Sequence, residues 1–304
     1  MKLIYSNLLV LLFFGINSFG QNMKEGFTYL ETGKYKQAEV FFKGILKEYP
    51  NNKTARLCFG RAIGLNGKAK KAVVIFTNLL KDYPKDFEVK LNYGESLLWS
   101  KYYIEAKLYY KALLKENDKS FPALLGYANT LSNLKEFKKA LTFADKALLV
   151  LPGNNNALVS KKYMRLGLAN NKLQTKEYEV SEKLLMENLK TFKNDKETLL
   201  NLANLYLISN QIDKAKNTYE IIGENSVNKL ISLNGISLAY HLNSDNKTAL
   251  NYSKKAVEAI DKNTPETLIN QTTERYIQAL IWNKKYSIAA AKIKKLLNNN
   301  KAPK

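Results

Sequence analysis

The chain has a single histidine, His241, and a single cysteine, Cys58, which limits the chemistry that its side chains could perform. Ser-His-Asp and Cys-His sites need a histidine beside the nucleophile, and a zinc site needs several Cys or His ligands. No glycine-rich phosphate-binding motif occurs. Carboxylates such as Glu25 and Glu31 lie at unrelated spacings. The sequence therefore predicts a non-enzymatic protein with no catalytic residues, no cofactor-binding residues and no metal site.

The residues that remain for function are those that could bind a partner, and a 34-residue period positions them. Alanine recurs at this period four times, as Ala38, Ala72, Ala106 and Ala140. Glycine lies twelve residues before the first three of these alanines, as Gly26, Gly60 and Gly94. Proline lies twelve residues after the first, second and fourth, as Pro50, Pro84 and Pro152. Such a strict period predicts a supersecondary unit that stacks on copies of itself.

Each unit reads as two helices joined by a short turn. In the first unit Gly33 ends one helix and Tyr35 begins the next. Ala38, Phe42 and Ile45 then recur at spacings of four and three, which places them on one helical face. Pro50 ends the second helix because it lacks an N–H group.

The recurring small, aromatic, alanine and proline positions resemble the tetratricopeptide repeat family. The resemblance implies an all-α fold, a right-handed superhelical solenoid of about eight helix-turn-helix repeats. Repeats 1–4 match well over residues 21–154, and repeats 5–8 are degenerate over residues 155–300. The period breaks before Ser181 and before Ala289, so a kink or joint is expected around Leu166–Lys176. Residues 301–304 are expected to form a frayed tail.

Residues 1–20 read as a signal peptide. Lys2 precedes the apolar run Leu8–Phe14, and the small residues Ser18 and Gly20 follow it. The run is too short for a confident membrane span, which needs about 20 residues, although an uncleaved anchor is an alternative. No transmembrane segment is expected once the signal is removed. The protein is therefore expected to be exported, to the periplasm or outer membrane of a Gram-negative bacterium.

The net charge of +21 raises the question of a nucleic-acid or membrane partner. Nearly all the cations are lysines, and many fall on predicted second helices and turns, as Lys43, Lys81 and Lys111 do. A nucleic-acid groove would instead concentrate cations along the inner track, between aromatic side chains. The distribution disfavours nucleic acid. Salt-sensitive attraction to anionic lipid is a further alternative.

The resemblance also implies which side chains line the concave face, because the first helices of successive repeats form that face in the family. Asparagine can donate to and accept from a ligand backbone, and tryptophan is a large, rigid anchor. The candidate partner-binding residues carried over in this way are Phe27, Arg61, Asn92, Glu95, Trp99, Asn129, Asn204, His241, Arg275 and Trp282.

These features predict a protein-protein interaction scaffold of the bacterial cell envelope. It would bind an extended peptide or a partner helix on its concave face. The alternative is an accessory factor of envelope polysaccharide assembly or export, with the polysaccharide-export machinery as its partner. This alternative rests on a likeness of the stretch from Asn92 through Gly126–Asn129 to repeat blocks that precede the barrels of exopolysaccharide exporters.

Overall fold

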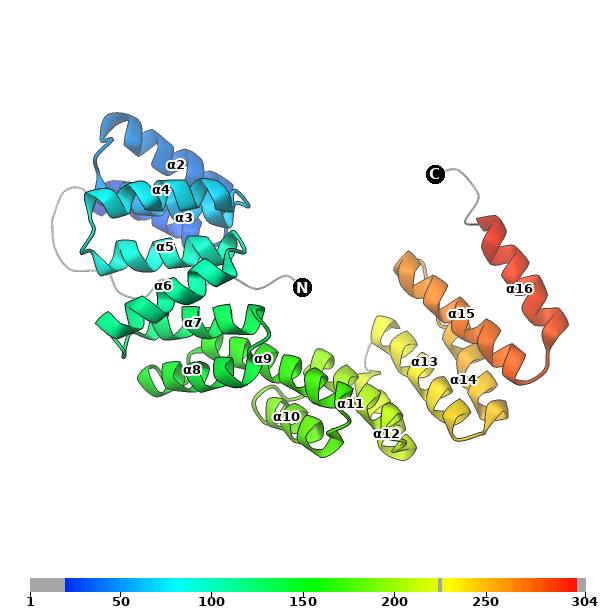
Figure 1. Ribbon diagram of the computed structural model, residues 1–304. Coiled ribbons are helices and arrows are strands. Elements are labelled where there is room, and N and C mark those ends of the chain that lie inside the picture. The colour runs from blue at the N-terminus through cyan, green and yellow to red at the C-terminus, as the bar shows by residue number, and fades with distance from the viewer. Residues whose placement is uncertain (1–19, 224–225, 300–304) are drawn as a thin grey trace. The chain divides into compact units, whose positions relative to one another are not determined.

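A computed structural model of the chain describes residues 20–223 and 226–299 (Figure 1). These residues form sixteen helices and no strand, so the all-α prediction is confirmed for the part of the chain that is described. The helices divide into two compact units, unit 1 up to Gly167 and unit 2 from Leu168. The predicted signal peptide lies outside the described residues except for Gly20, and the predicted tail 301–304 lies wholly outside them.

Unit 1 consists of helix pairs that follow one another along the chain. In each pair the first helix packs on the second, and the second packs on the first helix of the next pair. The pairs are α1 (Gly20–Glu31) with α2 (Tyr35–Glu48), α3 (Lys53–Leu65) with α4 (Ala69–Asp82), α5 (Phe87–Trp99) with α6 (Tyr103–Glu116), and α7 (Phe121–Asn133) with α8 (Phe137–Val150). The first helices also contact each other, α1 with α3, α3 with α5 and α5 with α7, and so form one layer.

The long helix α9 (Asn155–Gln174) begins in unit 1 and ends in unit 2. Its 20 residues, against 13 in α7, accommodate the seven extra residues of the fifth repeat. The remaining helices of unit 2 are α10 (Tyr178–Thr191), α11 (Lys196–Ile208), α12 (Ile212–Ile222), α13 (Ser226–Leu242), α14 (Asn246–Glu258), α15 (Glu266–Trp282) and α16 (Tyr286–Asn299). The division by repeat quality, 21–154 against 155–300, stays a prediction.

The period also sets where helices begin. Asn52, Asp86 and Ser120 are each separated by one repeat period, and each side chain accepts a hydrogen bond from the backbone N–H three residues later. Asn154 does the same for Ala157 at 3.0 Å. Such caps satisfy N–H groups that have no partner inside the helix. The first helix of each of these repeats therefore starts at a fixed place in the period.

A left-handed residue closes the turn inside each pair. It is glycine in the first two repeats, Gly33 with φ 73° and Gly67 with φ 84°. At the same turn of the later repeats, the residues with positive φ are Lys101, Lys135, Lys176, Asn210, Ser244 and Lys284. Their spacings reproduce the two breaks in the period, before Ser181 and before Ala289. The turns therefore occur where the eight repeats predicted from the sequence require them.

Small residues allow the helices to approach closely in the core. Ala38, Ala72, Ala106 and Ala140 are fully buried. A Cβ atom added at Gly60 would lie 2.7 Å from the ring of Phe76, itself fully buried. Phe42, Phe76 and Tyr110 occupy equivalent positions, so each second helix of the first three repeats inserts one aromatic ring against a glycine of a first helix.

No helix among residues 20–223 and 226–299 combines the length and the hydropathy needed to cross a bilayer.

Candidate functional site

Four of the predicted partner-binding residues occupy one row on the first helices of unit 1. Phe27, Arg61, Glu95 and Asn129 recur at the repeat period and lie on α1, α3, α5 and α7. Because these four helices contact one another in sequence, the four positions follow one another across the layer. The repeat register thus brings predicted residues into one row, which we call the inner row.

Within and beside the inner row, Arg61, Asn92 and Glu95 form a hydrogen-bonded cluster. Arg61 Nη1 donates to Asn92 Oδ1 at 2.9 Å and to Glu95 Oε2 at 3.3 Å. The Arg61 and Glu95 side chains are only 16% and 21% exposed. Asn92 Nδ2 in turn donates to the backbone carbonyl of Glu88 at 2.8 Å. This cluster links α3 to α5 by one ion pair and one hydrogen bond.

Burial dominates the electrostatics around this cluster. It raises the pKa of the Glu95 carboxyl, and the Arg61 guanidinium opposes that rise. It also raises the pKa of Glu88. The thiol of Cys58 has its pKa raised to about 12 by burial, so it stays protonated and is a poor nucleophile at neutral pH. Arg61, Asn92 and Glu95 therefore offer polar groups to a ligand, whereas the Cys58 thiol is unsuited to nucleophilic chemistry.

Two predicted residues of unit 1 pack within the repeats. The Phe27 ring centroid lies 6.1 Å from that of the buried Phe42. The Trp99 ring covers Gly64, where an added Cβ would lie 2.3 Å from Trp99 Cε3. Trp99 therefore seals the contact between α5 and the second repeat, and its use as a partner anchor stays a prediction. Asn129 is half-buried on α7.

In unit 2 the structure brings His241, Arg275 and Trp282 together from α13 and α15. The imidazole of His241 lies parallel to the indole of Trp282, with ring centroids 3.5 Å apart and 1° between the planes. Arg275 Cζ lies 5.9 Å from the centroid of the Trp282 ring. His241 Nδ1 is 2.7 Å from Asn246 Oδ1 and shares a hydrogen bond with it. Two aromatic rings and a cation thus form one cluster, which we call the His241 cluster.

Arg275 has no ion-pair partner within the described residues. Its guanidinium donates to Gln278 Oε1 at 2.9 Å. Burial lowers its pKa, and the nearby Tyr219 hydroxyl opposes that effect. A half-buried cation held over an aromatic ring without a carboxylate can bind an incoming anionic or carbonyl group.

Asn234 on α13 adds a second polar group to this part of unit 2. Its Nδ2 donates to Thr272 Oγ1 at 2.8 Å. Its Oδ1 is buried and has no hydrogen-bond partner among the described protein atoms. The remaining predicted residue, Asn204 on α11, is exposed.

A family model for the tetratricopeptide repeat matches residues 23–52, which comprise most of α1 and all of α2. The apo form of RapI is structurally similar, with a TM-score of 0.65 and 16% identity over 91% of this chain and 86% of RapI. A tetratricopeptide repeat protein from Parabacteroides merdae gives a TM-score of 0.51 and 18% identity over 84% of this chain and 98% of its own. Residues 23–52 thus match the tetratricopeptide repeat, and the two solved structures share the fold of this chain. No curated protein is similar enough in sequence to match it.

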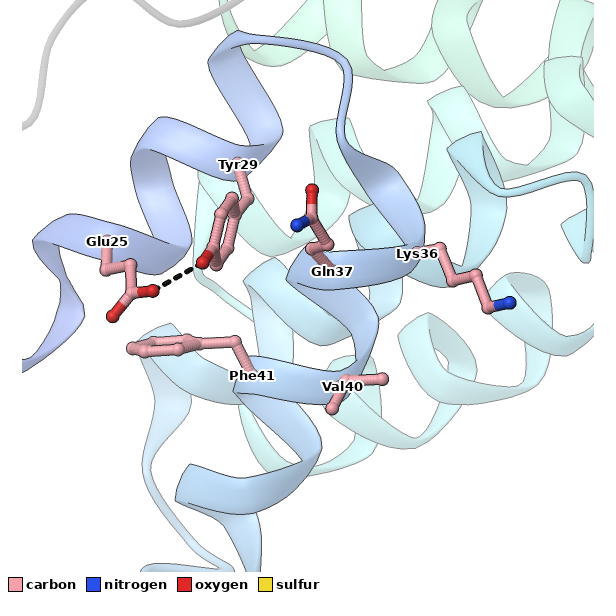
Figure 2. Close-up of a pocket in the computed structure, with 6 residues that line it drawn as sticks. All are labelled: Glu25, Tyr29, Lys36, Gln37, Val40 and Phe41. Carbon is pink, nitrogen blue, oxygen red and sulfur yellow. Dashed lines mark hydrogen bonds between the residues drawn. The ribbon is translucent and has the colours of Figure 1, made fainter.

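The protein also has an open recess in its first repeat, away from the inner row. Figure 2 shows Glu25 and Tyr29 from α1 facing Phe41 from α2, with the Tyr29 hydroxyl donating to the Glu25 carboxylate. That hydrogen bond raises the pKa of Tyr29. The recess measures about 370 Å³, and Lys36, Gln37 and Val40 complete its lining. None of the ten predicted residues lines it, because the prediction considered only the concave face.

Among the residues that the structure describes, no three His, Cys, Asp or Glu side chains are grouped so as to hold a metal ion.

Proposed function

We propose that this tetratricopeptide-repeat protein is a non-enzymatic scaffold that binds a protein partner through the first-helix faces of its units. The repeat fold supports protein-protein interaction in general. The single observation that carries the proposal is the Arg275 guanidinium, which has no ion-pair partner among the described residues and lies beside the stacked rings of His241 and Trp282. Arginine and tryptophan are the residue types that contribute most to protein interfaces.

The partner segment that suits the His241 cluster is an extended peptide carrying a carboxylate. The carboxylate would pair with Arg275, which lacks an acidic partner in the described structure. The inner row of unit 1 offers a second polar surface through Arg61, Asn92 and Glu95.

Photo-crosslinking from the face of the His241 cluster tests this proposal. A benzoylphenylalanine at Glu274, which is exposed beside Arg275 on α15, should give an adduct with a protein in the native host. The same replacement at Glu258, 61% exposed on the second helix α14, serves as the matched control and should give none. Arg275→Gln should reduce the Glu274 adduct at least about 10-fold, because a buried interface arginine commonly contributes over 1 kcal/mol. Equal adducts from both positions, or none from either, would contradict a binding site on this face.

Export to the cell envelope is the second part of the proposal. It is supported by the positive residue, the apolar run Leu8–Phe14 and the small residues that precede Gln21. The full chain with a C-terminal tag should fractionate with the envelope and begin near Gln21 when its N-terminus is sequenced. Leu11→Arg with Leu12→Arg should retain it in the cytoplasm, because charges in the apolar run abolish its recognition as a signal. A full-length wild-type protein in the cytosol would refute export.

Neither the fold nor the similar structures support the alternative role in polysaccharide assembly or export.

A further inference from the structure

Exposed aliphatic side chains recur at one position on three successive second helices of unit 1. Val40 on α2, Val74 on α4 and Leu108 on α6 occupy the same place in the repeat and are 68%, 59% and 67% exposed. Ile104, one turn before Leu108, is 61% exposed. A single exposed aliphatic residue is ordinary on a protein surface, but a row at a fixed repeat position is a patterned feature. We call these four residues the outer row.

Lysines border the outer row on both sides. Lys36 and Lys70 lie four residues before Val40 and Val74, and therefore one turn away on the same helical face. On the other side the exposed lysines are Lys43, Lys47, Lys81, Lys111 and Lys115. None of these seven lysines forms an ion pair with a described residue.

Three nearby carboxylates form their ion pairs with other cations, although Lys43 still contributes to lowering the pKa of Glu39. Asp82 pairs with Arg56 at 2.7 Å, and Glu116 pairs with Lys90 at 2.6 Å, so both carboxylates bind cations of first helices. Glu39 pairs with Lys68 at 2.6 Å. The outer row is thus an apolar strip between cations without ion-pair partners, separate from the inner row and from the His241 cluster.

We propose that the outer row is the docking surface for an acidic amphipathic helix of a protein partner. Apolar side chains of that helix would cover the aliphatic strip, and carboxylates along its two edges would pair with the lysines. Seven residues of a helix rise about 10.5 Å, so an amphipathic partner helix presents apolar side chains at regular intervals along one face. A partner helix crossing α2, α4 and α6 would place such side chains against Val40, Val74 and Leu108 in turn. Figure 1 shows these three helices in succession along unit 1.

A helix fits this surface better than an anionic bilayer does. The strip is one short side chain wide at Val40 and Val74, and it lies on rigid, packed helices. Lysine side chains are longer than valine side chains, so their ammonium groups project beyond the apolar strip. A helix can lie between the two lysine borders, whereas membrane-inserting faces typically present Trp, Phe and Leu, and this strip offers two valines, one isoleucine and one leucine.

The test uses the full chain and a fluorescein-labelled, end-capped 18-residue peptide with leucine at heptad a and d positions and glutamate elsewhere. A scrambled peptide of the same composition measures non-specific attraction to the basic protein. Fluorescence anisotropy should give a Kd that rises at least about 10-fold in the variant Val40→Ser/Val74→Ser/Leu108→Ser. A Lys36→Gln/Lys70→Gln/Lys111→Gln variant should bind more weakly and with less dependence on salt.

A matched variant controls for the loss of exposed apolar surface elsewhere. Leu149, Ile208 and Ile221 are 81%, 51% and 49% exposed and lie off the outer row. Their simultaneous replacement by serine should leave the peptide Kd unchanged, as should Arg275→Gln, which separates this proposal from the one for the His241 cluster. Circular dichroism should show all variants folded, since every residue replaced in the outer-row and matched variants is exposed.

Three results would overturn the docking surface. The first is equal affinity for the designed and scrambled peptides. The second is equal loss in the outer-row and matched variants. The third is sedimentation with vesicles of mixed phosphatidylglycerol and phosphatidylcholine that depends on Val40, Val74 and Leu108 while the peptide does not bind, which would assign the surface to membranes instead.

Discussion

Gly126→Val should cost unit 1 about 3 kcal/mol or more of its free energy of unfolding, among the largest effects of any single substitution in it. A Cβ atom at Gly126 would lie 2.4 Å from Cζ and 2.6 Å from the hydroxyl of Tyr110. That ring is 1% exposed, and on its other side Gly94 leaves only 2.9 Å between a built Cβ and Cζ. Since the ring lies between α5 and α7, it cannot retreat without separating two repeats. Urea unfolding followed by far-UV circular dichroism should show the lower midpoint.

Replacing a glycine of α2 should instead raise the free energy of unfolding. A Cβ atom at Gly44 meets no atom within 4 Å. Gly44→Ala should therefore stabilise the protein by about 0.5–1 kcal/mol through helix propensity alone. Gly126→Ala, which gains the same propensity but meets Tyr110, should destabilise it. Stabilisation by both alanines would mean that the Tyr110 ring has room to move.

Much of the fold could be predicted because it is local and periodic. Ala38 and its equivalents fix the register, and Gly33, Pro50 and their counterparts mark where helices end. The N-cap residues Asn52, Asp86 and Ser120 recur at the same period, but the small and aromatic positions that define the repeat do not include them. The turn residue Lys101 was also not recognisable as left-handed. The backbone hydrogen bonds that end α5, from the N–H groups of Lys101 and Tyr102 to the carbonyls of Leu98 and Leu97, accompany its positive φ, whereas lysine itself has no preference for it.

The candidate site could be predicted only as a set of positions. The separation of Arg61 and Glu95 by one repeat period was a usable signal that they are neighbours on adjacent first helices. No such signal joins His241 to Trp282, whose separation departs from the period because they lie in degenerate repeats. For Trp99 the register gives the place on the helix but not the rotamer, and the space above Gly64 decides where the ring lies.

The outer row shows how net charge can hide a more specific surface. The charge of +21 drew attention to the lysines as one diffuse property of the second helices. Val40, Val74 and Leu108 lie among these lysines at the same period. Their exposure could not be inferred from hydrophobicity, because apolar residues on an amphipathic helix are ordinarily assigned to the core. The structure shows that these three side chains are exposed, so the basic surface carries an apolar row at the repeat period.

Arg61→Met should lower the stability of unit 1 by about 2 kcal/mol at pH 8, somewhat less than a fully buried pair would give. The substitution keeps most of the side-chain volume but leaves the Glu95 carboxylate, 21% exposed, without its cation. Glu95→Gln in the same background should restore most of the loss, because a neutral amide needs no counter-ion. As a control, Lys254→Met removes an exposed pair whose atoms are 3.7 Å apart, and its effect should stay within about 0.5 kcal/mol.

The loss caused by Arg61→Met should shrink as the pH falls. Burial raises the folded-state pKa of Glu95, and Arg61 opposes that rise, so removing Arg61 raises the pKa further. The folded state then holds a proton that the unfolded state releases above about pH 4.3, and stability falls as the pH rises through that window. Below it Glu95 is neutral in both states and the missing cation costs little. The Arg61→Met/Glu95→Gln variant should lack this slope. A loss that is the same at pH 4.5 and pH 8 would instead mean that Arg61 stabilises α3 and α5 by packing its aliphatic stem, not by its charge.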